Sequence, residues 1–209
     1  MDEIFKNRIN NQFKIFKSKS KKIRKVVLAG SGAVGKTSIV RVLKEKKTLI
    51  QFEDADKKYY RTPFMEIETI KTNDMSEMTN PDSGEGNILL CDIAGQMDLP
   101  IHALKELSNF VLGGADLIML VFSNGNTQSF LDLSDWIELI KDYYESKEYP
   151  MPAFLLVKNK MDLPESVEEA FVNMMIENEK NIINYIQLSC VNGKNVDHLK
   201  EFLVNLFQF

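Results

Sequence analysis

The chain reads Gly30-Ser31-Gly32-Ala33-Val34-Gly35-Lys36-Thr37 directly after the apolar residues 26–29. This spacing fits G-x-x-x-x-G-K-[ST], and its position between an apolar strand-like run and a helix is the context of a phosphate-binding loop. Such a loop offers backbone N–H groups and the positive end of a helix dipole to phosphate oxygens. Lys36 would reach the β- and γ-phosphates, and the Thr37 hydroxyl would ligate Mg²⁺. The stretch therefore predicts a nucleoside triphosphate site, with a ligand-free glycine-rich turn as the alternative.

From residue 26 onward, short apolar runs alternate with longer amphipathic segments. This alternation is typical of an α/β fold in which helices cover both faces of a mainly parallel sheet. The polar residues 71–87 are rich in turn formers, so we expect the strands on either side to pair as an antiparallel hairpin. We expect strands near 24–29, 64–72, 87–92, 116–122, 153–158 and 184–189, and helices near 35–46, 98–111, 128–146, 165–180 and 195–207.

A second motif, Asp92-Ile93-Ala94-Gly95-Gln96, follows the apolar residues 88–91. An acidic side chain at the end of a strand can face the Mg²⁺ that a phosphate loop positions, and the Gly95 N–H can reach a γ-phosphate. Gln96 is then the candidate for orienting the attacking water. An ordinary strand-to-loop turn is the alternative, but the motif and the phosphate loop together favour a catalytic metal–triphosphate site.

A third motif, Asn159-Lys160-Met161-Asp162, follows the apolar residues 153–157 and indicates which base is bound. The Asp162 carboxylate can accept from N1–H and the 2-amino group of guanine, and adenine does not offer these donors. A buried acceptor left unpaired by the wrong base gives strong discrimination. Asn159 can tie this segment to the phosphate loop, and the stem of Lys160 can cover a face of the base. Further along, Ser189-Cys190-Val191 ends another apolar run and could present a backbone N–H to the guanine carbonyl.

Composition and charge describe an ordinary water-soluble chain of 209 residues, 44% hydrophobic and 27% charged, without an apolar run long enough to span a membrane. Neither a signal-peptide core nor a lipidation motif is present, so we expect a cytoplasmic protein without an encoded lipid anchor. Cys91 and Cys190 stand far apart in or beside apolar runs and are expected to be buried, reduced thiols. Residues 1–25 hold nine Lys or Arg and two acidic residues, although the net charge is −4. The remainder is thus acidic, which argues against nucleic-acid binding.

Residues 1–22 stand outside the α/β alternation, and we expect a basic amphipathic arm ahead of a nucleotide-binding domain over residues 23–209. Phe5, Ile9, Phe13 and Phe16 recur at helical spacing with lysines between them. One interpretation is peripheral attachment to an anionic membrane surface. The others are a helix docked on the domain or on a partner, and a partly disordered, solvated arm.

Taken together, the phosphate loop, D-x-x-G-Q, N-K-x-D and the serine-initiated base loop resemble the motifs of the Ras-like small GTPases, in the same order, over residues 23–209. The resemblance implies a six-stranded sheet with five helices that binds GTP or GDP with Mg²⁺ and hydrolyses GTP slowly without an activating partner. It also implies exchange factors, GTPase activators and effectors as partner proteins.

The resemblance also indicates which residues of this chain form the site. Nucleotide contacts are expected from Gly30, Ser31, Gly32, Ala33, Val34, Gly35, Lys36, Thr37, Ser38, Thr62, Gly95, Asn159, Lys160, Asp162, Ser189, Cys190 and Val191. The metal ligands are expected to be Thr37, Thr62 and Asp92, and the catalytic groups Gln96, Lys36 and Arg61.

Thr62 is assigned as the switch threonine that the resemblance requires, since it directly precedes the second expected strand. Thr48 is the rival, because the segment between Thr37 and Thr62 is longer than in the family. Arg61 precedes Thr62 much as an arginine does in heterotrimeric G-protein α subunits, where it stabilises transition-state charge. It is therefore either an arginine finger supplied in cis or a surface arginine.

Several residues depart from the family pattern. Cys190 and Val191 stand where Ala and Lys are usual, and Met97 stands where an acid is common. The following residues 98–104 are largely apolar and would form either a partner surface or core packing. Two other functions remain open: a nucleotide-loaded regulatory scaffold with negligible hydrolysis, and an ATP-using P-loop kinase or ATPase, which the N-K-x-D motif disfavours.

Overall fold

The computed structural model describes residues 2–18, 22–51, 62, 65–75, 86–95 and 109–207. The strands are β1 (Ile23–Ala29), β2 (Met65–Lys71), β3 (Asn87–Ile93), β4 (Leu117–Ser123), β5 (Ala153–Asn159) and β6 (Ile182–Gln187). The helices are α1 (Asp2–Ser18), α2 (Lys36–Glu45), the 3₁₀ turn η1 (Leu49–Gln51), α3 (Thr72–Met75), α5 (Thr127–Leu131), α6 (Leu133–Ser146), α7 (Glu169–Asn178) and α8 (Val196–Phe207). Within the described ranges, no helix combines the length and the apolar character needed to cross a membrane.

The six strands form one sheet in the order β2-β3-β1-β4-β5-β6. β2 pairs with β3 in antiparallel register, and every other neighbouring pair is parallel. The predicted α/β class, with its mainly parallel sheet and one antiparallel edge pairing, is confirmed. Because β1, β3, β4, β5 and β6 run in the same direction, the loops that follow them open at one edge of the sheet, where α/β folds bind ligands.

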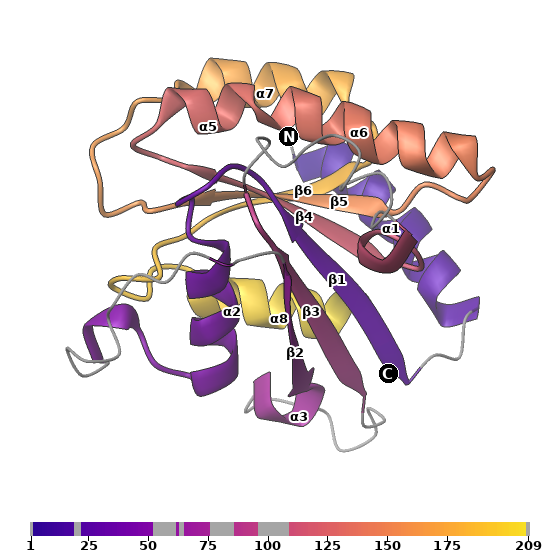
Figure 1. The fold of residues 1–209 in the computed structure, drawn as a ribbon, viewed down its shortest axis with the longest axis horizontal. Coiled ribbons are helices and arrows are strands. Elements are labelled where there is room, and N and C mark those ends of the chain that lie inside the picture. Colours follow the sequence, from indigo (N-terminus) through magenta and orange to yellow (C-terminus); the bar gives the residue numbers. More distant parts are fainter. Residues whose placement is uncertain are drawn as a thin grey trace.

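Strand β1 illustrates why the sheet is covered on both faces. Val26 and Leu28 pack in one apolar cluster with side chains of α2 and α8, whereas Val27 and Ala29 pack in a second cluster with side chains of α6 and α7. Successive side chains of a strand point to opposite faces, so a continuous apolar run requires cover on both sides. Figure 1 shows this layering, with α5, α6 and α7 on one face and α2 and α8 on the other.

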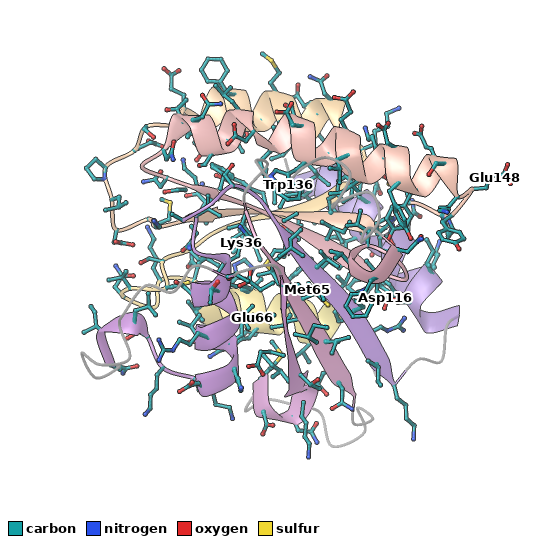
Figure 2. The ribbon with its side chains drawn as sticks, viewed as in Figure 1. Lys36, Met65, Glu66, Asp116, Trp136 and Glu148 are labelled. Atoms are coloured by element: carbon teal, nitrogen blue, oxygen red, sulfur yellow. The ribbon has the colours of Figure 1, made fainter. Side chains whose placement is uncertain are left out.

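The largest fully buried side chain, Trp136, belongs to α6 and fills the cluster on that face. Figure 2 shows it pointing from the helix toward the sheet. A side chain of this size contributes on the order of 3 kcal/mol by leaving water. This packing holds α5 and α6 against β4, whose last residue leads into the candidate site.

Several element boundaries differ from the sequence prediction. The expected helix 128–146 is divided into α5 and α6 at Asp132, whose backbone stays helical (φ −60°, ψ −18°) and whose N–H donates to Gln128. The expected helix 165–180 begins only at Glu169, because residues 165–168 belong to an anchored loop. Strand β6 begins two residues earlier than expected, since Ile182 and Ile183 are buried in the core. Of the expected helix 98–111, residues 109–111 are helical and the rest lie outside the described residues.

Residues 2–18 form helix α1, which packs on the domain with the face that the sequence pattern singled out. That face contacts both core clusters, through Phe5 in one and Ile9, Phe13 and Phe16 in the other. In the structure, therefore, α1 is docked on the domain, which is one of the three arrangements that the sequence left open. Figure 1 shows α1 on the opposite side of the molecule from α2.

Two arginines fasten α1 to the domain: Arg8, in the middle of the helix, and Arg24 of β1, which contacts its C-terminal turn. Arg8 Nη1 donates to the carbonyls of Ile176, Glu179 and Ile182 at 3.0, 3.0 and 2.7 Å, around the carboxyl end of α7. A guanidinium in this position also interacts favourably with the helix dipole. Arg24 Nη2 donates to the Phe16 carbonyl at 3.0 Å, and its guanidinium lies 4.9 Å from the centre of the Phe16 ring.

Candidate functional site

The phosphate loop joins β1 to α2, and two of its glycines are required by their surroundings. A Cβ on Gly30 would lie 2.1 Å from the Val121 carbonyl oxygen, and a Cβ on Gly35 would lie 2.3 Å from Asn159 Nδ2. Both glycines also have positive φ, 139° and 96°, a region that side chains disfavour. The loop is therefore packed too closely for any other residue at these two positions.

The rest of the loop leads into α2 as the motif predicts. Ala33 has a positive φ of 59°, Val34 is buried in the core, and α2 begins at Lys36 with Ser38 in its first turn. No described side chain caps the N-terminus of α2. The first N–H groups of a helix need an acceptor from outside it, and an anion such as phosphate can supply one.

Lys36 is buried, and its side chain folds back over its own loop. Its ammonium donates to the carbonyls of Gly30 at 2.7 Å and Ser31 at 2.8 Å. Burial lowers the pKa of Lys36 to about 8, against the opposing effect of the Asp92 carboxylate. The charge is thus held between the loop and Asp92, where a bound anion would favour the protonated form.

Three predicted metal ligands meet although they come from three separate segments. Thr37 donates a hydrogen bond to Asp92 Oδ2, and Thr62 Oγ1 lies 3.0 Å from Thr37 Oγ1 and 3.2 Å from Asp92 Oδ2. Thr48, the rival to Thr62, lies elsewhere, with its methyl group 2.7 Å from the position of a Cβ on Gly193. The structure therefore brings Thr62, and not Thr48, next to Thr37 and Asp92.

The donor set fits Mg²⁺. Asp92 is buried, and its Oδ1 has no hydrogen-bond partner among the described residues. Burial raises the pKa of Asp92, while hydrogen bonds from Thr37 and Thr62 and the charge of Lys36 act in the opposite direction. Oxygen ligands are those that Mg²⁺ prefers, completed by water and phosphate.

Gly95 lies directly against the phosphate loop. A Cβ there would be 2.3 Å from the carbonyl of Ser31 and 2.5 Å from the Gly32 nitrogen. Gly32 is more open, since its own Cβ would meet only the Gly95 oxygen, at 3.8 Å. Gln96 and Arg61, the predicted catalytic residues besides Lys36, lie outside the described residues, as do residues 97–104.

The loops that follow β5 and β6 meet beside the phosphate loop. Asn159 Nδ2 donates to the Val34 carbonyl at 3.0 Å, which is the tie between the two motifs that the sequence suggested. Asp162 Oδ1 accepts from the Ser189 hydroxyl at 2.6 Å, and Ser189 Oγ accepts from the Val191 N–H at 3.2 Å. Lys160, which lies between Asn159 and Asp162 in the chain, has a left-handed backbone conformation with φ 62°.

Cys190 departs from the family pattern but is well accommodated. Its thiol is buried, and burial raises its pKa to about 12, so it remains protonated at neutral pH. Its backbone carbonyl accepts from the Leu49 N–H at 2.8 Å, and the Val191 carbonyl accepts from Ile50 at 3.4 Å. Backbone hydrogen bonds thus join the segment after α2 to the base loop. The sequence could not predict this contact, because every residue except proline carries the same backbone groups.

Comparison with known proteins agrees with the motifs. Residues 25–208 match the model of the Ras family. Ras-related protein Rab-28 of Caenorhabditis elegans is 30% identical over 144 residues, covering 69% of this chain and 50% of the worm protein's length. Ras-related protein Rab-7B of Dictyostelium discoideum is 25% identical, covering 90% of this chain and 84% of its own. Ras-related protein Rab-27A of Mus musculus is 27% identical, covering 87% and 77%.

Proposed function

Since the chain belongs to the Ras family of small GTPases, we propose that it is a molecular switch that binds GTP and GDP with Mg²⁺ and hydrolyses GTP to GDP and phosphate. The observation that carries this proposal is the convergence of Thr37, Thr62 and Asp92 beside the buried Lys36. Two hydroxyls, one carboxylate and one ammonium at the start of a helix suit a metal–triphosphate.

In this proposal the chain's own groups bind the nucleotide at both ends. The N–H groups at the start of α2 and the Lys36 ammonium bind phosphate oxygens. Asp162 accepts from the guanine N1–H and 2-amino groups, and the base loop at Ser189, Cys190 and Val191 donates a backbone N–H to the guanine carbonyl. The Asp162–Ser189 hydrogen bond supports this assignment, because it holds the carboxylate beside that loop.

Mg²⁺ would be held by the hydroxyls of Thr37 and Thr62 and by Asp92, directly or through water. When bound, the ion neutralises charge that develops on the β- and γ-phosphates. Gln96 is proposed to orient the attacking water, Lys36 to hold the phosphate oxygens in line, and Arg61 to stabilise the transferred charge in cis.

Switching follows from where Thr62 and Gly95 stand in the chain. Thr62 precedes β2 and Gly95 follows β3, so each lies at the boundary of a segment that reaches the phosphate loop. A γ-phosphate would bind both segments, and its loss would release them for exchange factors, activators and effectors to distinguish.

We also propose a cytoplasmic location with peripheral membrane contact through residues 1–22. The apolar face of α1 packs on the domain, so insertion of that face into lipid would require α1 to leave its docking site. Binding to anionic vesicles with α1 intact and deleted would test it.

Nucleotide binding is tested by titrating EDTA-stripped protein with fluorescent GDP and competing with GTP and ATP, with and without Mg²⁺. We expect competition by GTP, little by ATP, and weaker binding without Mg²⁺. Preference for ATP would contradict the proposal. Single-turnover phosphate release then tests hydrolysis, and GTP that stays intact for hours even with cell extract would favour the regulatory scaffold instead.

A further inference from the structure

A lysine stands fully buried directly before the N-K-x-D motif. Lys158 is the penultimate residue of β5, and its side chain is 0% exposed. Its ammonium donates to Glu165 Oε1 at 2.6 Å, Glu169 Oε1 at 2.8 Å and the Val167 carbonyl at 3.1 Å. An ammonium has three donors, so this one is fully paired, as a buried charge must be if it is not to be strongly destabilising.

The two carboxylates reach Lys158 from the surface, where Glu165 is 56% and Glu169 41% exposed. Burial works against the charge of Lys158, but its hydrogen bonds to Glu165 and Glu169 outweigh that effect and raise its pKa. Glu169 Oε1 also accepts from the Tyr185 hydroxyl at 3.1 Å and Gln187 Nε2 at 3.0 Å. One cluster therefore joins β5, the following loop, the first turn of α7, and β6.

The loop that this cluster holds is the one that carries Asp162. It leaves β5 at Asn159, which is fixed to the phosphate loop, and returns to the domain at Glu165 and Val167, which are fixed to Lys158. Asn124 holds the middle of the loop, donating to the Leu163 carbonyl at 2.7 Å and accepting from the Ser166 N–H at 2.9 Å. A loop without a ladder of its own keeps one shape only through such anchors.

We propose that Lys158 is a positioning residue for guanine recognition. By clamping the exit of the loop to β5 and β6, it keeps Asp162 at the Ser189 hydroxyl and facing the base. This inference rests on the guanine-nucleotide binding proposed above. The competing interpretation is an ion cluster that only stabilises α7, and the two differ in their effect on base selectivity.

Inosine diphosphate separates the two interpretations, because its base keeps the guanine carbonyl and N1–H but lacks the 2-amino group. A misplaced Asp162 loses part of its contact with that amino group, so the affinity for GDP falls more than the affinity for inosine diphosphate. A general loss of stability weakens both nucleotides alike. The measured quantity is the ratio of the two dissociation constants, together with the release rate of fluorescent GDP.

Lys158→Met is the main variant, since methionine replaces the ammonium stem with an apolar chain of similar length. Lys141→Met is the matched control: its ammonium pairs with Glu179 at 2.5 Å, which also links a lysine to the α7 region but away from the base loop. Glu169→Gln is the second variant should Lys158→Met fail to fold, because Glu169 is partly exposed and glutamine preserves its shape.

We expect Lys158→Met or Glu169→Gln to speed GDP release about fivefold and to reduce the preference for GDP over inosine diphosphate by about the same factor, as for the partial loss of one hydrogen bond to a charged group. Lys141→Met should change neither. An unchanged preference in a folded variant, or an equal weakening of both nucleotides, would overturn the inference. Wild-type protein that fails to bind GDP would overturn the proposed function itself.

Discussion

Ser31 in the phosphate loop donates its hydroxyl hydrogen bond to Asp132, which lies 101 residues further along the chain, at 2.5 Å. The other carboxylate oxygen of Asp132 accepts from Gln128 Nε2 at 2.7 Å, and the Ser31 carbonyl accepts from Lys36 at 2.8 Å. Ser31 therefore connects the phosphate loop to the junction of α5 and α6 as well as to its own lysine.

Replacing Ser31 by alanine removes the donor to Asp132. We expect Ser31→Ala to lower the free energy of unfolding by about 1.5–3 kcal/mol, as for the loss of a hydrogen bond to a charged group, and to speed GDP release because the loop loses an anchor. Urea denaturation and fluorescent-GDP release measure the two effects. Gln128→Ala is the control, since Gln128 touches the same carboxylate but not the loop; equal release rates in the two variants would contradict the prediction.

Gly95→Ala should detach the segment after β3 from the phosphate loop, because the new Cβ would overlap the Ser31 carbonyl at 2.3 Å. We expect GTP affinity to fall more than GDP affinity, since the Gly95 N–H is proposed to bind the γ-phosphate. Competition titrations with both nucleotides provide the test. Gly114→Ala is the control: nothing lies within 4 Å of its Cβ and only its φ of 70° is unfavourable, which costs about 1–2 kcal/mol of stability. Equal losses of GTP and GDP affinity in Gly95→Ala would argue against this role.

Asp162→Asn should shift base preference from guanine toward xanthine. The amide replaces a charged acceptor with a donor and an acceptor, so it no longer matches the guanine N1–H and amino group but can pair with the xanthine carbonyl. Competition between GDP and xanthosine diphosphate measures the shift. Asp197→Asn, at a side chain that is 86% exposed on α8, should leave the preference unchanged. Unaltered GDP affinity in Asp162→Asn would mean that the base binds elsewhere.

Phe16→Ala should destabilise the whole domain and not only α1. Phe16 is 4% exposed, and its ring lies 5.3 Å from that of Phe207. Truncating a buried phenylalanine costs about 3–5 kcal/mol, measurable by urea denaturation. Ile4→Ala, at a position that is 37% exposed on the same helix, should change stability by about 0.5 kcal/mol or less. A Phe16→Ala variant as stable as Ile4→Ala would show that α1 is undocked in solution.

Thiol chemistry tests the burial of the base loop. Because burial raises the pKa of Cys190 to about 12, the folded protein binds this proton more tightly than the unfolded chain, whose ordinary value is 9.0. The stabilising contribution of Cys190 is therefore complete below pH 9 and is lost as the pH rises toward 12. At pH 8 we expect iodoacetamide to modify Cys190 slowly in folded protein and rapidly in urea, as read by mass spectrometry. Equally rapid modification in the folded protein would show that the loop is open.

Much of the fold was predictable because the signals are local. The continuous apolar run of β1 requires cover on both faces, whichever helices provide it. The phosphate loop is a short backbone geometry set by Gly30, Gly35 and the start of α2. The base motif likewise has a fixed order and spacing, so Asn159 and Asp162 could be assigned without coordinates. The helix break at Asp132 was missed, because one residue that keeps helical dihedrals leaves no mark in the hydrophobic pattern.

Contacts between distant segments that carry no motif were beyond the sequence. Thr62 and Thr48 were both compatible with the spacing, and only folding brought Thr62 to Asp92. The periodicity of α1 predicted an apolar face equally suited to lipid and to protein, and the structure shows this face packed on the domain, with Phe16 against Phe207. Nothing in the sequence around Lys158, the residue before the N-K-x-D motif, predicted that its ammonium would be buried against Glu165 and Glu169.

The chain by itself therefore established the α/β class and the chemical types of the residues proposed to bind phosphate and base, because hydrophobic period and motif spacing act over a few neighbouring residues. Which threonine joins Asp92, where α1 lies, and what holds the loop of Asp162 depended on the assembled sheet, because the partners in each contact come from segments far apart in sequence. Their free energy arises only when burial brings those segments together and removes water from between them.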